Sequence, residues 1–142
     1  MCIRDRSNTV VLILSMLDEI AWLTNLRGSD IEFNPVFEAY AAIFPDRAIC
    51  FCHHPEANLS QYCPDWEFRP YSEYQSFLTK LAGLGNLQVW LDSSSVTMGT
   101  LLAFSKFQVV EKESPVILQK AVKNSSEISA AKTAHKLSLI HI

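Results

Sequence analysis

Residues 10–24, VVLILSMLDEIAWLT, decide the fold class of this chain. The unbroken β-branched and leucine run Val10 to Leu14 is typical of a strand buried on both faces. Ser15 stands three residues before Asp18, the spacing of a capping box, so a helix is predicted to begin after Ser15. Its apolar face repeats at helical intervals, at Leu17, Ile20, Ala21 and Thr24. A buried strand that leads directly into a helix indicates an α/β protein.

The rest of the chain continues this alternation of strands and helices. Two runs, 38–44 and 47–52, flank Pro45-Asp46 and predict an antiparallel hairpin. Further strands are expected at 66–70, 87–91 and 107–110, and further helices at 71–81, 96–104 and 116–123, the first of these ending at Gly83 or Gly85. A hairpin within a βα alternation predicts a mixed β-sheet flanked by helices.

The composition excludes several function classes. Twelve basic and 15 acidic residues give a formal charge of −3, which argues against a nucleic-acid or anionic membrane surface. The chain is 49% hydrophobic with four glycines, as expected of a domain with a real core. The apolar run 9–17 is far shorter than the roughly 20 residues of a membrane-spanning helix. Cys50, Cys52 and Cys63 cannot form a closed set of disulfides, so reduced thiols and a cytoplasmic location are expected.

Both ends of the chain have unusual sequences. Back-translation of residues 137–142 gives DNA whose reverse complement encodes the Met-Cys-Ile-Arg-Asp of the first five residues. Such a relation is typical of a sequencing adapter present in both orientations. We therefore expect residues 1–6 and 137–142 to be adapter-derived. We also expect the chain to be a piece of a longer protein and to hold no complete catalytic site of its own.

Two blocks of sequence carry a family resemblance. Residues 17–30, LDEIAWLTNLRGSD, and 34–37, NPVF, resemble the second creatinase-like domain of Xaa-Pro aminopeptidases of the three-domain form. The second block resembles the linker into that family's pita-bread catalytic domain, through Ser114-Pro115-Val116, Lys120-Ala121, Lys123-Asn124, Glu127 and Ala134-His135. The resemblance implies a creatinase N-terminal-like fold with ribonuclease H-like layering. It divides the chain into a non-catalytic domain at 7–113 and a linker with the first catalytic-domain helix at 114–136.

The resemblance also implies a function. The family removes the N-terminal residue that precedes proline, with two divalent metal ions, usually manganese, that activate a water molecule. Its metal ligands lie beyond the position of Lys136, so no catalytic or metal-binding residue is assigned here, and the chain alone is expected to be inactive. The implied partners are its own catalytic domain, a proline-containing peptide and a second subunit in a homodimer. The alternative is an interaction domain from a catalytically inactive relative, like the large subunit of the FACT histone chaperone.

The candidate site is the loop made of Asn25, Arg27, Gly28, Ser29 and Asp30. It has two interpretations. In the structural one, Gly28 permits a tight turn and Arg27 pairs with Asp30 or caps nearby carbonyl groups. In the functional one, the loop shapes the substrate entrance or the domain interface.

Two other groups have the composition of a site. Cys50, Cys52, His53, His54 and Cys63 form a cysteine–histidine cluster, but strand alternation directs Cys50 and Cys52 into the core, and the spacing fits no usual zinc pattern. The neighbouring carboxylates of Asp18 and Glu19 are explained by the positive end of a helix dipole. The tryptophans, Trp22, Trp66 and Trp90, lie in apolar patterns and are predicted to be core residues.

Overall fold

A computed structural model describes residues 9–55, 58–84, 87–105 and 109–140 of the chain, and within them six strands form one sheet. The strands are β1 (Thr9–Leu14), β2 (Ala39–Ile43), β3 (Ala48–Cys52), β4 (Trp66–Pro70), β5 (Leu87–Leu91) and β6 (Val109–Glu111). Their order is β4-β3-β2-β1-β5-β6. β2 runs antiparallel to both β1 and β3, whereas β1, β5 and β6 are mutually parallel. The mixed sheet and the hairpin of β2 and β3 confirm the prediction.

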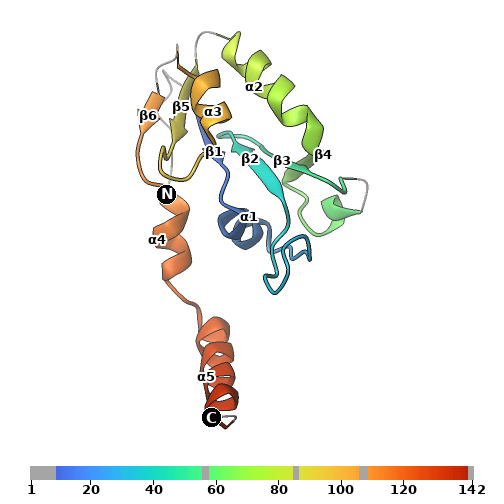
Figure 1. The fold of residues 1–142 in the computed structure, drawn as a ribbon, viewed down its shortest axis with the longest axis vertical. Coiled ribbons are helices and arrows are strands. Elements are labelled where there is room, and N and C mark those ends of the chain that lie inside the picture. The colour runs from blue at the N-terminus through green and yellow to red at the C-terminus, as the bar shows by residue number, and fades with distance from the viewer. Residues whose placement is uncertain (1–8, 56–57, 85–86, 106–108, 141–142) are drawn as a thin grey trace.

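Helices cover both faces of the sheet (Figure 1). On one face lie α1 (Leu17–Thr24) and α4 (Pro115–Ala121), and on the other lie α2 (Tyr74–Ala82) and α3 (Met98–Ala103). Short 3-10 turns, η1 (Leu59–Gln61) and η2 (Tyr71–Glu73), flank β4. The last helix, α5 (Ser125–Ile140), extends away from these layers. No helix in the described part of the chain has the length and apolar character of a bilayer-crossing segment.

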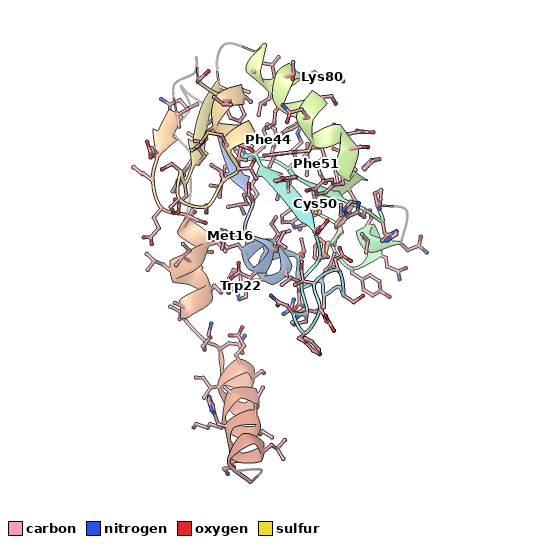
Figure 2. The ribbon with its side chains drawn as sticks, viewed as in Figure 1. Met16, Trp22, Phe44, Cys50, Phe51 and Lys80 are labelled. Atoms are coloured by element: carbon pink, nitrogen blue, oxygen red, sulfur yellow. The ribbon has the colours of Figure 1, made fainter. Side chains whose placement is uncertain are left out.

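The strand β3 shows how the sequence divides its side chains between two cores. Ile49 and Phe51 point into the core beneath α2 and α3, while Cys50 and Cys52 point into the core beneath α1 and α4. Figure 2 labels Cys50 and Phe51, neighbours in sequence on opposite faces. The alternation follows from the two-residue period of a strand, and it confirms that the two cysteines share a buried face.

Aromatic rings fill the core beneath α2. Phe51 is fully buried, and its ring centroid lies 5.4 Å from that of Tyr74 and 4.9 Å from that of Phe77. Tyr74 also stacks on Tyr40 at 3.9 Å, and its hydroxyl lies 3.0 Å from Thr100 Oγ1 at the start of α3. The predicted periodicity of α2 is therefore confirmed.

Helix ends are where prediction and structure differ most. Met16 is the N-cap of α1 and makes no capping bond, so the capping box predicted at Ser15 is wrong. Ser15 continues the alternation of β1, and its hydroxyl is buried beside that of Tyr74 instead of turning back to the helix. By contrast, the cap of α5 is reciprocal: the Asn124 amide donates to Glu127 Oε2 at 2.8 Å, and the Glu127 amide donates to Asn124 Oδ1 at 2.9 Å.

Three further boundaries shift slightly. α2 ends at Gly83, whose amide donates to the carbonyl oxygens of Thr79 and Lys80, while Gly85 lies outside the described residues. α3 is shorter than expected because Thr97 caps it. β6 covers Val109–Glu111, and the earlier part of the predicted strand, residues 107–108, lies outside the described residues.

The tryptophans lie at the margins of the cores. All three are half-buried, and Trp22 and Trp66 pack against the core beneath α1 and α4. The Trp90 indole N–H donates to the Lys112 carbonyl at 3.1 Å. Trp22 and Trp66 therefore border a core, and none of the three tryptophans is a fully buried core residue as the sequence predicted.

The substitution Phe51→Ala tests the core beneath α2. Removing a fully buried ring leaves a cavity beside its two aromatic neighbours, Tyr74 and Phe77, and we expect the free energy of unfolding to fall by about 3–5 kcal/mol. Urea denaturation followed by circular dichroism measures this change. Lys80→Ala on the exposed side of α2 is the control and should change the value by less than about 0.5 kcal/mol. A similar small change for both variants would contradict the assignment.

Candidate functional site

The candidate loop begins where α1 ends. Asn25 adopts a left-handed conformation, with φ of 53°, and its amide donates to the Trp22 carbonyl. Arg27 Nη1 then donates to the carbonyl oxygens of Ala21 and Leu26, both at 2.8 Å. The guanidinium group thus lies at the negative end of the helix dipole, where a cation is stabilising. Carbonyl capping is one of the two structural roles predicted for Arg27.

Gly28 is needed because two segments of chain approach each other closely. A Cβ atom at this position would lie 2.6 Å from Phe37 Cβ and 3.1 Å from the Val36 carbonyl oxygen. A side chain would therefore push the loop away from the segment that leads into β2. The structural requirement is this close approach, and it replaces the tight turn that the sequence suggested.

Asp30 connects the loop to the end of β3 through a series of contacts. Its Oδ2 atom accepts the amide of Glu38 at 2.8 Å, and Glu38 Oε2 lies 3.0 Å from His53 Nε2. The His53 ring in turn stacks on Tyr71, with centroids 4.5 Å apart. No hydrogen bond or ion pair joins Arg27 to Asp30 among the residues that the structure describes, so the second predicted role of Arg27 is not observed.

Beside these contacts, an open pocket of about 240 Å³ lies between the end of α1 and the end of β3. Four of the five predicted site residues line it, all except Asn25. The complete lining consists of Leu26, Arg27, Gly28, Ser29, Asp30, Phe37, Cys52, His53, His54 and Leu59. The structure therefore brings the candidate loop together with part of the cysteine–histidine cluster. Sequence reasoning missed the apolar members Leu26, Phe37 and Leu59, which resemble any other core residue in the sequence.

The thiols of the cluster are buried, and no disulfide joins the described cysteines. The neighbouring Cys52 thiol and burial both raise the pKa of Cys50 far above its ordinary value. Burial likewise raises the pKa of Cys63, whose Sγ donates to the Thr24 carbonyl at 3.0 Å. Protonated thiols of this kind are poor nucleophiles and poor metal ligands. Among the described residues, no group of three or more His, Cys, Asp and Glu has an arrangement that could hold a metal ion.

A second polar cluster joins α1 to the start of α4. Glu19 is only 3% exposed and accepts a 2.6 Å hydrogen bond from Ser114 Oγ, 95 residues away in sequence. Asp92, at the end of β5, accepts the Ser114 amide at 3.2 Å. Asp18 forms an ion pair with Lys120 of α4. The two carboxylates that the sequence explained by a helix dipole alone thus also hold α4 against α1.

The environment changes the acidity of this cluster. Burial raises the pKa of Glu19, and the hydrogen bond from Ser114 opposes that change only in part. The hydrogen bond from Ser94 lowers the pKa of Asp92. The ionised form of Glu19 is therefore less stable in the folded chain than in the unfolded chain.

Comparison with known proteins shows where this fold occurs. Residues 3–127 match the family model described as the creatinase/prolidase N-terminal domain. In structure, the chain resembles an X-prolyl aminopeptidase from Caenorhabditis elegans, with a TM-score of 0.79 and 21% identity over 88% of this chain and 22% of that one. It also resembles the N-terminal domain of the peptidase PepQ from Mycobacterium tuberculosis H37Rv, with a TM-score of 0.55 and 15% identity over 78% of this chain and 86% of that one.

The fold therefore defines an α/β domain of the kind seen in the N-terminal domain of PepQ. The chain belongs to the creatinase/prolidase N-terminal domain family. It is 38% identical to Xaa-Pro aminopeptidase 1 of Dictyostelium discoideum over 129 residues, covering 88% of this chain and 20% of that protein. It is 31% identical to the Xaa-Pro aminopeptidase ApepP of Drosophila melanogaster, covering 90% of this chain and 22% of that protein. The chain thus spans about a fifth of the length of the curated relatives that it matches.

The substitution Gly28→Ala tests the close approach of the loop to Phe37. Because the added methyl group would lie 2.6 Å from Phe37 Cβ, we expect the free energy of unfolding to fall by about 1–3 kcal/mol. The matched control is Gly99→Ala in α3, where the nearest atom, Thr97 Oγ1, is 4.0 Å away. Alanine is the better helix former, so the control should be neutral or more stable by up to about 1 kcal/mol. Equal effects at both glycines in thermal denaturation would disprove the steric argument.

Glu19→Gln tests the buried carboxylate. The pKa of Glu19 is raised above 4.5 in the folded chain, so above this pH the folded state binds more protons than the unfolded state. The free energy of unfolding therefore falls as the pH rises from 4.5 through the raised pKa. Glutamine retains an acceptor for Ser114 but does not titrate. As the pH rises above about 4.5, the free energy of unfolding of the variant should therefore decrease less than that of the parent chain.

Denaturant titrations at several pH values measure this difference. The exposed substitution Glu73→Gln changes the net charge equally and serves as the control. Parallel stability profiles for Glu19→Gln and the parent would show that Glu19 has no such linkage.

Proposed function

We propose that the chain is the non-catalytic creatinase-like domain of a metal-dependent Xaa-Pro aminopeptidase, which removes the N-terminal residue that precedes proline. The observation that carries the proposal is the similarity to Xaa-Pro aminopeptidases over 88% of this chain but only 20% of the relative's length. The peptidase names of the matched relatives favour this function over an interaction domain from a catalytically inactive relative.

The chemistry of the full-length protein is proposed to lie outside these residues. The C. elegans neighbour is described as a cytosolic enzyme with a di-nuclear active site. The described residues here contain no group of ligands for such ions. In our proposal two divalent ions, manganese by preference, bind in the catalytic domain of a cytoplasmic enzyme. They would supply an activated water molecule for amide hydrolysis.

We further propose that this domain comprises residues 7–113 and that residues 114–136 lead into the catalytic domain. Ser114 caps α4, which packs on α1, and α5 then extends away from both layers (Figure 1). The family match continues to residue 127, into the first turn of α5. Residues 1–6 and 137–142 stay predicted as adapter-derived.

The role proposed for the domain is to pack against the catalytic domain and limit access to its cleft. The Arg27–Asp30 loop is well suited to form part of that entrance because it is rigid yet accessible. Arg27 fixes it to the end of α1, Gly28 packs it against Phe37, and Ser29 and Asp30 remain exposed. A second subunit of a homodimer is a further proposed partner.

Peptide hydrolysis tests the proposed function. The 142-residue chain should not cleave an Xaa-Pro peptide in the presence of manganese, whereas the full-length protein should release the N-terminal residue and lose activity with a chelator. Liquid chromatography of the products measures both reactions. Turnover by the chain alone would refute the placement of the chemistry, and an inactive full-length protein would refute the peptidase assignment.

A further inference from the structure

The pocket between α1 and β3 carries two opposite charges that do not pair with each other. Arg27 and Asp30 both line it, and they lie three residues apart on one loop. Both hydrogen bonds of Arg27 use Nη1, so within the described part of the chain the N–H groups of Nε and Nη2 remain as donors. Asp30 uses Oδ2 for the Glu38 amide, which leaves Oδ1 as an acceptor. One pocket thus offers a cationic donor and an anionic acceptor.

The floor of the same pocket is apolar. Leu26, Phe37 and Leu59 line it, and all three are half-buried. Cys52, which is buried, also lines the pocket. The volume of about 240 Å³ is below the range of about 300–1,000 Å³ that is usual for drug-sized ligands. The pocket therefore suits a small molecule with one apolar group.

The loop is also held in place before any ligand arrives. Arg27 is fixed by two carbonyl groups, Asp30 by a backbone amide, and the chain between them by the contact of Gly28 with Phe37. A preorganised site loses less conformational entropy on binding. The positions of the two charges are therefore set by the fold and not by the ligand.

We propose that this pocket binds a free α-amino acid with an apolar side chain. The ligand carboxylate accepts hydrogen bonds from Arg27, the ligand ammonium group donates to Asp30, and the side chain packs against Leu26, Phe37 and Leu59. A simple anion or a simple cation would satisfy one charge and leave the other facing it. A zwitterion satisfies both, and charge-assisted hydrogen bonds of this kind are the stronger ones.

This binding site goes beyond the proposed peptidase function and does not require it. An aminopeptidase releases an amino acid of this class at each turnover, so the pocket would let the domain respond to the product. Binding to the 142-residue chain is measured without any hydrolysis. Failure of the binding experiment and failure of the peptidase assay are therefore separate results.

A ligand series on the 15N-labelled 142-residue chain tests the proposal by NMR titration. L-Leucine should give saturable shifts at the amides of residues 26–30 and 52–54. Leucinamide lacks the carboxylate, N-acetylleucine lacks the ammonium group, and glycine lacks the side chain, so each should bind at least about tenfold more weakly. Equal shifts with leucine and N-acetylleucine, preferential binding of the dipeptide Leu-Pro, or no saturable shifts with leucine would overturn the proposal.

Two variants test whether Asp30 and Arg27 bind the charged groups of leucine. Asp30→Asn keeps an oxygen acceptor for the Glu38 amide but removes the negative charge. It should weaken leucine binding at least about tenfold, while its NMR spectrum without ligand remains that of a folded chain. Arg27→Met should have a similar effect on binding, and Asp30→Asn decides the outcome if that variant fails to fold. The controls are Glu73→Gln and Lys80→Met, which remove one charge each on exposed positions of η2 and α2. Unchanged leucine affinity in Asp30→Asn, or equal weakening in the controls, would contradict the assignment.

Discussion

The hydrogen bond from Ser114 to the buried Glu19 carboxylate joins the two ends of this domain. It connects the first helix of the chain to the segment that follows the last strand, and Asp92 extends it to the end of β5. With α4 fixed in this way, Val116 completes the apolar layer around Ile20. A buried carboxylate is costly unless it is hydrogen-bonded, so its presence favours one arrangement of α1 and α4 over others. The position of α1 in turn sets where the candidate loop begins.

The loop after α1 is a rigid element despite its lack of regular secondary structure. Two carbonyl oxygens hold the Arg27 guanidinium group, and Phe37 contacts Gly28 from the other side. The structural and functional interpretations of the loop are therefore compatible, because the contacts that fix its backbone also fix its exposed charges. The same guanidinium group that caps α1 retains donors for a ligand.

Local features of the fold could be predicted from the sequence, and contacts between distant residues could not. The strand β3 and the helix α2 follow from the two-residue and 3.6-residue periods of their apolar side chains. The cap of α5 follows from Asn124 and Glu127, three residues apart. Ser15 has the same spacing to Asp18, but it directly follows the buried strand β1, and its hydroxyl is buried. A spacing rule cannot detect this competition between a cap and a tertiary contact.

The candidate site shows the same limit. Arg27, Gly28, Ser29 and Asp30 could be found because they form one unusual stretch, whereas the pocket they line also needs residues from β3 and η1. The bond between Glu19 and Ser114 spans 95 residues, and nothing in either local sequence indicates the other partner.

The geometry of α5 has a mechanical consequence. Its residues 125–136, which precede the segment predicted to be adapter-derived, form a rod roughly 18 Å long that follows α4 through residues 122–124. Rotation at the base of a rod moves its far end most, so a tilt of about 10° would displace the far end of this one by roughly 3 Å. The contacts of Glu19 and Asp92 with Ser114, and of Asp18 with Lys120, thus restrain the base from which α5 extends.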